Sequence, residues 1–115
     1  MTEFEKMAKR LQQFVEARDW DKFHNPKDLS MQLTLEATEV MEHFLWKNDA
    51  EMAAHCATHQ EDIADELADV LNNLILLADK LKIDLVKAHE RKLAKNEIKY
   101  PVEKSRGHAK KYTEL

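Results

Sequence analysis

Glycine and proline are nearly absent from this chain, and their absence limits the possible folds more than any other feature. The 115 residues include one glycine, Gly107, and two prolines, Pro26 and Pro101. Average usage predicts roughly eight glycines in a chain of this length, and residues 27–100 contain neither residue type. Tight β-hairpins and the glycine-rich phosphate loops of Rossmann and P-loop proteins depend on glycine. The sequence therefore predicts an all-α fold.

Apolar residues recur at helical spacing along five segments. The pattern predicts helices over residues 2–18, 28–47, 49–59, 60–81 and 84–97. Asp28 is the predicted N-cap of the second helix, and Pro101 is expected to end helical order. Residues 101–115 are basic and are expected to be extended or loosely attached. We expect a single domain over residues 1–115, a compact fold like a four-helix bundle with this basic tail.

The second predicted helix is apolar on more than one side. Its main stripe includes Leu33 and Val40, but Met31, Leu35 and Met41 add apolar surface elsewhere. A domain of about this length also buries only a modest core by itself. Both observations predict a homo-oligomer.

The net charge, the cysteine content and the length of the apolar runs argue against several other classes of protein. The chain has 18 basic and 22 acidic residues, a net charge of −4, which argues against a general nucleic-acid binder. Its one cysteine, Cys56, has no second cysteine with which to form an internal disulfide. The longest apolar run, residues 74–78, is too short to span a bilayer. We expect a cytoplasmic protein with neither nucleic acid nor membrane as a partner.

Two predicted helices carry acidic pairs beside their apolar stripes. Glu36 and Glu39 lie three residues apart in one helix, and Glu66 and Asp69 repeat this spacing in another. Like charges at this spacing destabilise a helix by roughly 0.2–0.5 kcal/mol per pair, a cost that a cation between them reduces. Four carboxylates form an all-oxygen ligand set suited to Mg²⁺ or Mn²⁺. A solvated acidic face is the competing interpretation.

The acidic pairs and their surroundings resemble a known family. The segments E-A-T-E at 36–39 and E-L-A-D at 66–69 are similar to the E-x-x-E and E-x-x-D motifs of the all-α nucleoside triphosphate pyrophosphohydrolases, in particular the MazG-like, dCTP pyrophosphatase-like branch. Further matching residues are Arg18, Asp19, Trp20, Phe23, His24, Pro26, Trp46, Lys47, Lys92, Asn96, Lys99, Tyr100 and Pro101. The resemblance extends from about residue 18 to the C-terminus.

The resemblance implies an enzyme of nucleotide-pool housecleaning. It would cleave the α–β phosphoanhydride bond of a nucleoside triphosphate, giving the monophosphate and pyrophosphate. The implied substrate is dCTP or a modified dCTP, with dATP as a further candidate. Glu36, Glu39, Glu66 and Asp69 would hold Mg²⁺, for which Mn²⁺ could substitute, and Glu39 would lie nearest the attacking water. The family also implies a homodimer or homotetramer with sites formed between chains.

Two further groups of residues would contact the substrate. The group implied for the base has aromatic faces for stacking and polar groups for edge recognition: Trp20, His24, Asn25 and Trp46. The group implied for the phosphates offers cations, amides and a hydroxyl: Asn73, Lys92, Asn96, Lys99 and Tyr100. Without the resemblance, the tryptophans would be interpreted as core or interface residues and the lysines as a solvated face.

Other functions compete with this interpretation. Glu51, His55 and His59 share one helix face with Cys56 beside them, which imitates a zinc site without a distant fourth ligand. A di-iron carboxylate bundle needs Glu-x-x-His pairs, which the acidic helices lack. The alternative from another class is a non-catalytic helical interaction or accessory module with a structural acidic face.

Overall fold

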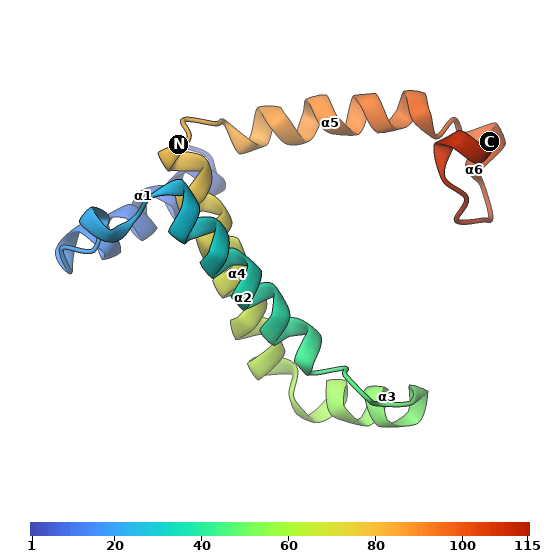
Figure 1. The fold of residues 1–115 in the computed structure, drawn as a ribbon, viewed down its shortest axis with the longest axis horizontal. Coiled ribbons are helices and arrows are strands. Elements are labelled where there is room, and N and C mark those ends of the chain that lie inside the picture. Colours follow the sequence, from blue (N-terminus) through green and yellow to red (C-terminus); the bar gives the residue numbers. More distant parts are fainter. The chain divides into compact units, whose positions relative to one another are not determined.

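The computed structural model describes residues 1–115 and contains helices without strands (Figure 1). The long helices are α1 (Glu3–Ala17), α2 (Pro26–Glu42), α3 (Asp49–Thr58), α4 (Gln60–Lys80) and α5 (Leu85–Lys99). Short elements are the 3₁₀ turns η1 (Asp21–Phe23) and η2 (Tyr112–Glu114) and the single-turn helix α6 (Val102–Ser105). The predicted all-α fold is confirmed. None of the helices combines the length and apolar character needed to cross a bilayer.

The chain forms two compact units, Met1–Lys82 and Ile83–Leu115. In the first unit α2 and α4 pack side by side, and α1 and α3 each contact α4 (Figure 1). Its buried apolar side chains come from α1, from the start of α2 and from the end of α4: Val15, Leu29, Ile75 and Ala78. The core of this unit therefore lies where these three helices meet, away from the end at which α3 joins α4.

The ends of α2 differ from the predicted ends. Asn25, and not Asp28, is the N-cap, since the Asn25 side chain accepts a hydrogen bond from the Asp28 backbone N–H. Pro26 takes the first helical position, where its missing N–H costs nothing. The helix ends at Glu42 and not at residue 47, and the turn that follows contains Trp46 with a φ of 61°. A left-handed backbone at a bulky residue cannot continue the helix.

The second unit contains α5, α6 and η2. Asp84 caps the start of α5 by accepting a hydrogen bond from the Lys87 backbone N–H at 3.1 Å. Beyond α5 the chain folds back, so that the rings of Tyr100 and Tyr112 meet edge to face with centroids 6.1 Å apart. Lys99 Nζ lies 4.8 Å from the centroid of the Tyr112 ring. The prediction of an extended or loosely attached tail is therefore wrong for α6 and η2.

Candidate functional site

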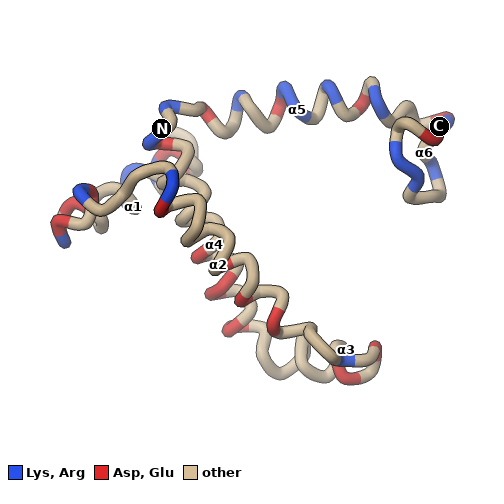
Figure 2. The backbone as a smooth tube through the Cα atoms, in the orientation of Figure 1, with Lys and Arg blue, Asp and Glu red and all other residues tan.

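The four acidic residues predicted to bind metal lie on the two helices that pack together. Glu36 and Glu39 belong to α2, and Glu66 and Asp69 belong to α4. Figure 2 shows acidic residues of both helices gathered along their shared length, with no basic residue among them. The ion pairs of the chain include no Lys or Arg bonded to any of the four. The packing of α2 on α4 thus concentrates negative charge without a compensating side-chain ammonium or guanidinium group.

In this acidic set two buried carboxylate oxygens, one on Glu36 and one on Glu66, have no hydrogen-bond partner, and the pKa values of two other carboxyls are raised. Glu36 Oε1 accepts a hydrogen bond from Gln32 Nε2 at 2.8 Å, but Glu36 Oε2 is buried without a partner. The negative charge of Glu36 is the largest cause that raises the pKa of Glu39 above its ordinary value. Desolvation, followed by the charge of Glu36, raises the pKa of Asp69. A divalent cation bound here would reduce the repulsion between the carboxylates and would give Glu36 Oε2 a partner.

The donor set fits a hard divalent cation in chemistry and charge. Carboxylate oxygens are the ligands that Mg²⁺ and Mn²⁺ prefer, and Glu36 Oε2 has no competing hydrogen bond. In this structure, however, no three acidic, histidine or cysteine side chains converge closely enough to hold an ion. The packing of α2 on α4 places the two acidic pairs on neighbouring helices, but the coordination geometry itself is not formed.

Histidines adjoin the acidic set at the end of α2. His43 Nε2 contacts Glu66 Oε2, an oxygen that has no well-aligned hydrogen bond. On the other side of the same ring, His43 Nδ1 lies 2.7 Å from Nε2 of His55 in α3. The His55 ring stacks on the ring of His59, with centroids 4.1 Å apart and an interplanar angle of 14°. Desolvation is the largest cause that lowers the pKa of His55, and the charge of His59 adds to it.

Sequence reasoning did not anticipate the contact between His43 and Glu66. His43 lies in the turn after α2 and Glu66 lies on α4, and the spacing of His43 from Glu39 in the sequence does not indicate a partner on α4. Glu51, His55 and His59 of the α3 region do not form a zinc site either. Glu51 Oε1 instead accepts a hydrogen bond from the Asn48 backbone N–H, in a capping box at the start of α3. Cys56 is exposed and free.

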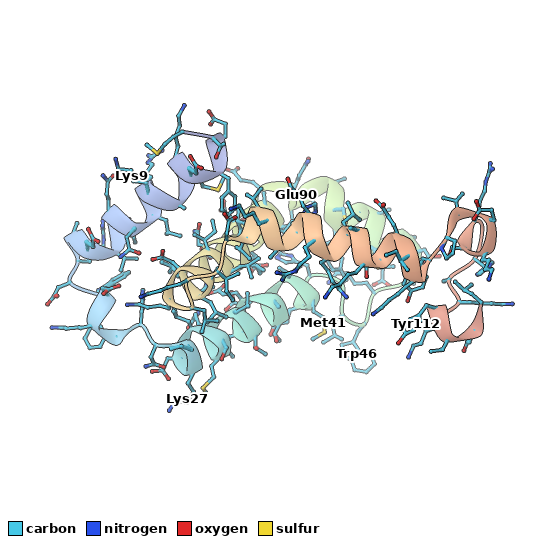
Figure 3. All side chains as sticks on the ribbon, turned by 90° about the horizontal axis from the view of Figure 1, so that it is seen from above. Lys9, Lys27, Met41, Trp46, Glu90 and Tyr112 are labelled. Atoms are coloured by element: carbon cyan, nitrogen blue, oxygen red, sulfur yellow. The ribbon has the colours of Figure 1, made fainter.

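The residues predicted to contact the base lie at opposite ends of α2. Trp20 and His24 precede this helix, whereas Trp46 follows it. A helix of 17 residues is about 25 Å long, and Figure 3 shows Trp46 far from Lys27, which lies in the first turn of the same helix. One copy of this chain therefore does not bring all of these side chains into a common pocket.

The individual side chains of the base group differ in what they contact. The Trp20 ring meets the Phe14 ring edge to face at 5.9 Å, and His24 Nδ1 is buried without a hydrogen-bond partner. Asn25 is engaged in capping α2, with Oδ1 accepting from the Asp28 N–H and Nδ2 donating to the Asp28 carboxylate at 2.7 Å. Trp46 is 93 % exposed. Its indole is the most available stacking surface of the group.

The residues predicted to contact phosphate are divided between the two units. Lys92, Asn96 and Lys99 lie on α5, and Tyr100 caps its end with its N–H donating to the Asn96 carbonyl at 2.8 Å. Both lysines are exposed, so their ammonium groups are open to an anionic ligand. Asn73 lies on α4 one turn after Asp69, and its Nδ2 donates to the Asp69 carbonyl at 2.8 Å. Its Oδ1 has no such partner in the chain.

Comparison with known proteins identifies a matching protein family and similar sequences. Residues 32–115 match the MazG-like family. The chain is 42 % identical over 105 residues to dCTP pyrophosphatase 1 of Rattus norvegicus and 38 % identical over 105 residues to that of Homo sapiens. These alignments cover 90 % of the chain but 62 % of each relative. The chain thus spans less than two thirds of the length of these relatives.

A solved structure supports the same grouping. The fold superposes on that of a pyrophosphatase from Archaeoglobus fulgidus with a TM-score of 0.82 and 33 % sequence identity. The superposition covers 88 % of this chain and 94 % of the archaeal chain. The comparisons confirm the resemblance that the two acidic motifs predict.

Proposed function

This chain belongs to the MazG-like family, and on that premise we propose that it is a metal-dependent nucleoside triphosphate pyrophosphohydrolase that removes unwanted nucleotides from the cellular pool. Water adds across the α–β phosphoanhydride bond, and a nucleoside monophosphate and pyrophosphate are released. The observation that carries the proposal is the packing of α2 on α4, which concentrates four carboxylates without a lysine or arginine partner. The names of the dCTP pyrophosphatase relatives and of the archaeal pyrophosphatase support it.

The acidic set is proposed to hold Mg²⁺, or Mn²⁺ in its place. A divalent cation supplies charge neutralisation for the triphosphate and lowers the pKa of a bound water. Glu36, Glu39, Glu66 and Asp69 are the proposed ligands. Glu39 is assigned the position nearest the attacking water, as the family resemblance implies; its side chain is exposed, like that of Asp69, whereas Glu36 and Glu66 are half-buried. Asn73, one turn after Asp69 on α4, would contact a phosphate group or a water molecule beside the cation.

Residues of α5 are proposed to bind the phosphates. Lys92 and Lys99 each bring a positive charge, Asn96 brings an amide, and Tyr100 brings a hydroxyl group. Positions 92, 96 and 99 share one helix face because they are spaced by four and three residues. Positive charge on this face complements the triphosphate, an anion that the acidic set by itself would repel.

The base is proposed to bind between copies of the chain. Trp20 and His24 from one copy would meet Trp46 from another, since α2 separates them within a single chain. Self-association is further supported by large apolar side chains that the first unit leaves exposed: Met31, Leu35, Met41, Leu45, Leu67 and Leu71. Exposed apolar surface of this extent marks interaction sites. We propose dCTP or a modified dCTP as the substrate, with dATP as a second candidate.

Pyrophosphate release from a panel of nucleotides tests this function. The purified protein is incubated with Mg²⁺ and dCTP, 5-methyl-dCTP, dATP, dGTP, dTTP or CTP, beside the variants Glu39→Gln and Asp69→Asn. Glu61→Gln is the matched control, because Glu61 is an exposed acid in the first turn of α4 outside the proposed site. We expect release from dCTP by the wild type and the control, and its loss in both site variants.

Two outcomes contradict the proposal. Activity that survives both site variants would remove these carboxylates from the reaction. A wild-type protein that releases pyrophosphate from none of the nucleotides would favour the alternative, a helical interaction module whose acidic face is structural.

A further inference from the structure

We propose that His43 is a positioning residue for Glu66 and that His55 fixes the orientation and tautomer of His43. The inference rests on the proposed function in one respect, since Glu66 is taken as a metal ligand. The contacts that carry it link three elements: the turn after α2, helix α3 and helix α4.

The first step is the contact between His43 and Glu66. His43 Nε2 lies against Glu66 Oε2, and the two side chains are 13 % and 27 % exposed. A lone pair on Nε2 would be repelled by the carboxylate oxygen, so the proton of a neutral His43 belongs on Nε2. Glu66 Oε2 is thereby held by the histidine, and Glu66 Oε1 remains for a cation.

The second step is the contact between His43 and His55. In a neutral His43 that carries its proton on Nε2, Nδ1 is an acceptor, and the 2.7 Å separation then assigns the donated hydrogen to His55 Nε2. Both rings are therefore Nε2–H tautomers. The stacked ring of His59 covers His55 on its other side.

The third step is the consequence for the carboxylate. Residues that hydrogen-bond a metal ligand fix its orientation, and their loss typically weakens metal binding by about 10–100-fold. His43 is largely buried and is placed against Glu66, so it acts through the ligand and does not need to touch the substrate. His55 extends the same restraint to α3, which contacts α4.

Metal affinity of the full chain provides the test. Mn²⁺ binding is measured by calorimetry for the wild type and for His43→Leu, His43→Gln and His55→Leu. His59→Leu is the matched control, because it removes an imidazole from the same cluster without removing a contact to Glu66. We expect His43→Leu to bind Mn²⁺ about 10–100-fold more weakly than the wild type. In His43→Gln, whose amide can still donate a hydrogen bond, most of this affinity should return. His55→Leu should lose less affinity than His43→Leu, and the His59→Leu control should bind Mn²⁺ as the wild type does.

Nitrogen-15 NMR of the histidine rings in the metal-free protein supplies a second readout. We expect His43 and His55 each to show a protonated Nε2 and an unprotonated Nδ1. A folded His43→Leu variant with wild-type Mn²⁺ affinity, or a His43 ring protonated on Nδ1, would overturn the inference. If circular dichroism shows that His43→Leu does not fold, the inference is tested by the Mn²⁺ affinity of His55→Leu and by the tautomer of His43 in the wild type. Wild-type affinity in His55→Leu together with a proton on Nδ1 of His43 would overturn it.

The same measurements separate this inference from the proposed function. If the wild type binds Mn²⁺ but hydrolyses no nucleotide, the proposed function is wrong. The positioning role of His43 is then tested by the Mn²⁺ affinity of the His43 variants alone. A wild-type protein that binds no Mn²⁺ would overturn both. Active wild-type protein with unchanged affinity in His43→Leu would overturn the positioning role alone.

Discussion

Lys80 Nζ lies 2.9 Å from Asp21 Oδ1 and joins the last turn of α4 to the 3₁₀ turn η1 that precedes α2. Gln12 Nε2 of α1 donates to the same carboxylate oxygen at 3.4 Å. Three elements therefore meet at one carboxyl group. Trp20 lies immediately before η1 and His24 immediately after it, so this carboxyl anchors the segment that carries two of the residues proposed to bind the base.

Removing the carboxylate of Asp21 is expected to lower the melting temperature at pH 7. The hydrogen bond from Lys80 is the largest cause that lowers the pKa of Asp21. A lowered pKa means that the folded state favours the ionised form, so the stabilisation is present above the unfolded pKa of about 3.9 and is lost as pH falls through the folded value. In thermal unfolding between pH 7 and pH 2, the melting temperature of the wild type should fall as the pH is lowered. The fall should be smaller in Asp21→Asn.

Asp19→Asn is the matched control for this prediction. Asp19 pairs with Lys22 at 2.9 Å in an exposed local contact, and its φ of 55° is one that asparagine tolerates. We expect its melting temperature to match that of the wild type. Lys80→Met should add no further loss in the Asp21→Asn background, and additive losses would contradict a direct Asp21–Lys80 interaction.

Asn25 is expected to contribute to stability through its cap. Asn25→Ala removes the acceptor for the Asp28 N–H at 2.9 Å and should destabilise the protein by about 1 kcal/mol. Asn25→Ser keeps a capping oxygen and should unfold near the wild-type urea concentration. If this variant keeps its stability but changes the preference among nucleotides, Asn25 also reads the base. An Asn25→Ala variant as stable as the wild type would contradict the capping role.

Divalent cations are expected to stabilise the folded chain. At a metal concentration about 100 times Kd, linkage adds about 2.7 kcal/mol to the free energy of unfolding, which calorimetric melting would detect. Glu39→Gln should raise the melting temperature of the metal-free protein, because it removes repulsion from Glu36 and Glu66. The same variant should lose most of the metal-induced shift. Glu61→Gln should retain the full shift, and equal shifts in both variants would contradict the ligand assignment.

Trp20 and Trp46 are expected to act in the same site from different copies of the chain. Each alanine variant should raise KM for dCTP, since stacking on a base contributes about 1–3 kcal/mol. Co-expressing Trp20→Ala with Trp46→Ala should restore about a quarter of the wild-type sites, because half of randomly formed dimers are mixed and each has one intact site. A mixture no more active than either variant alone would contradict a site shared between copies.

The helices could be predicted from the sequence because apolar spacing is a local property of the chain. The predicted and observed bounds of α1, α3 and α4 differ by a few residues at most. The end of α2 could not be predicted in this way, since a turn with Trp46 at positive φ replaces a helix that the apolar pattern continues. The cap at Asn25 was likewise missed, because Asp28 has an equally suitable side chain and only the observed hydrogen bond distinguishes them.

By itself, the sequence determined the helical class, the two acidic motifs and the family to which they belong, because these depend on residue type and on spacing along one helix. The tertiary structure decided which side chains meet. It placed Glu66 against His43, Asp21 against Lys80, and Trp20 and Trp46 beyond opposite ends of α2. Such relationships arise from the packing of separate helices, where the direction of each side chain depends on residues distant in the sequence.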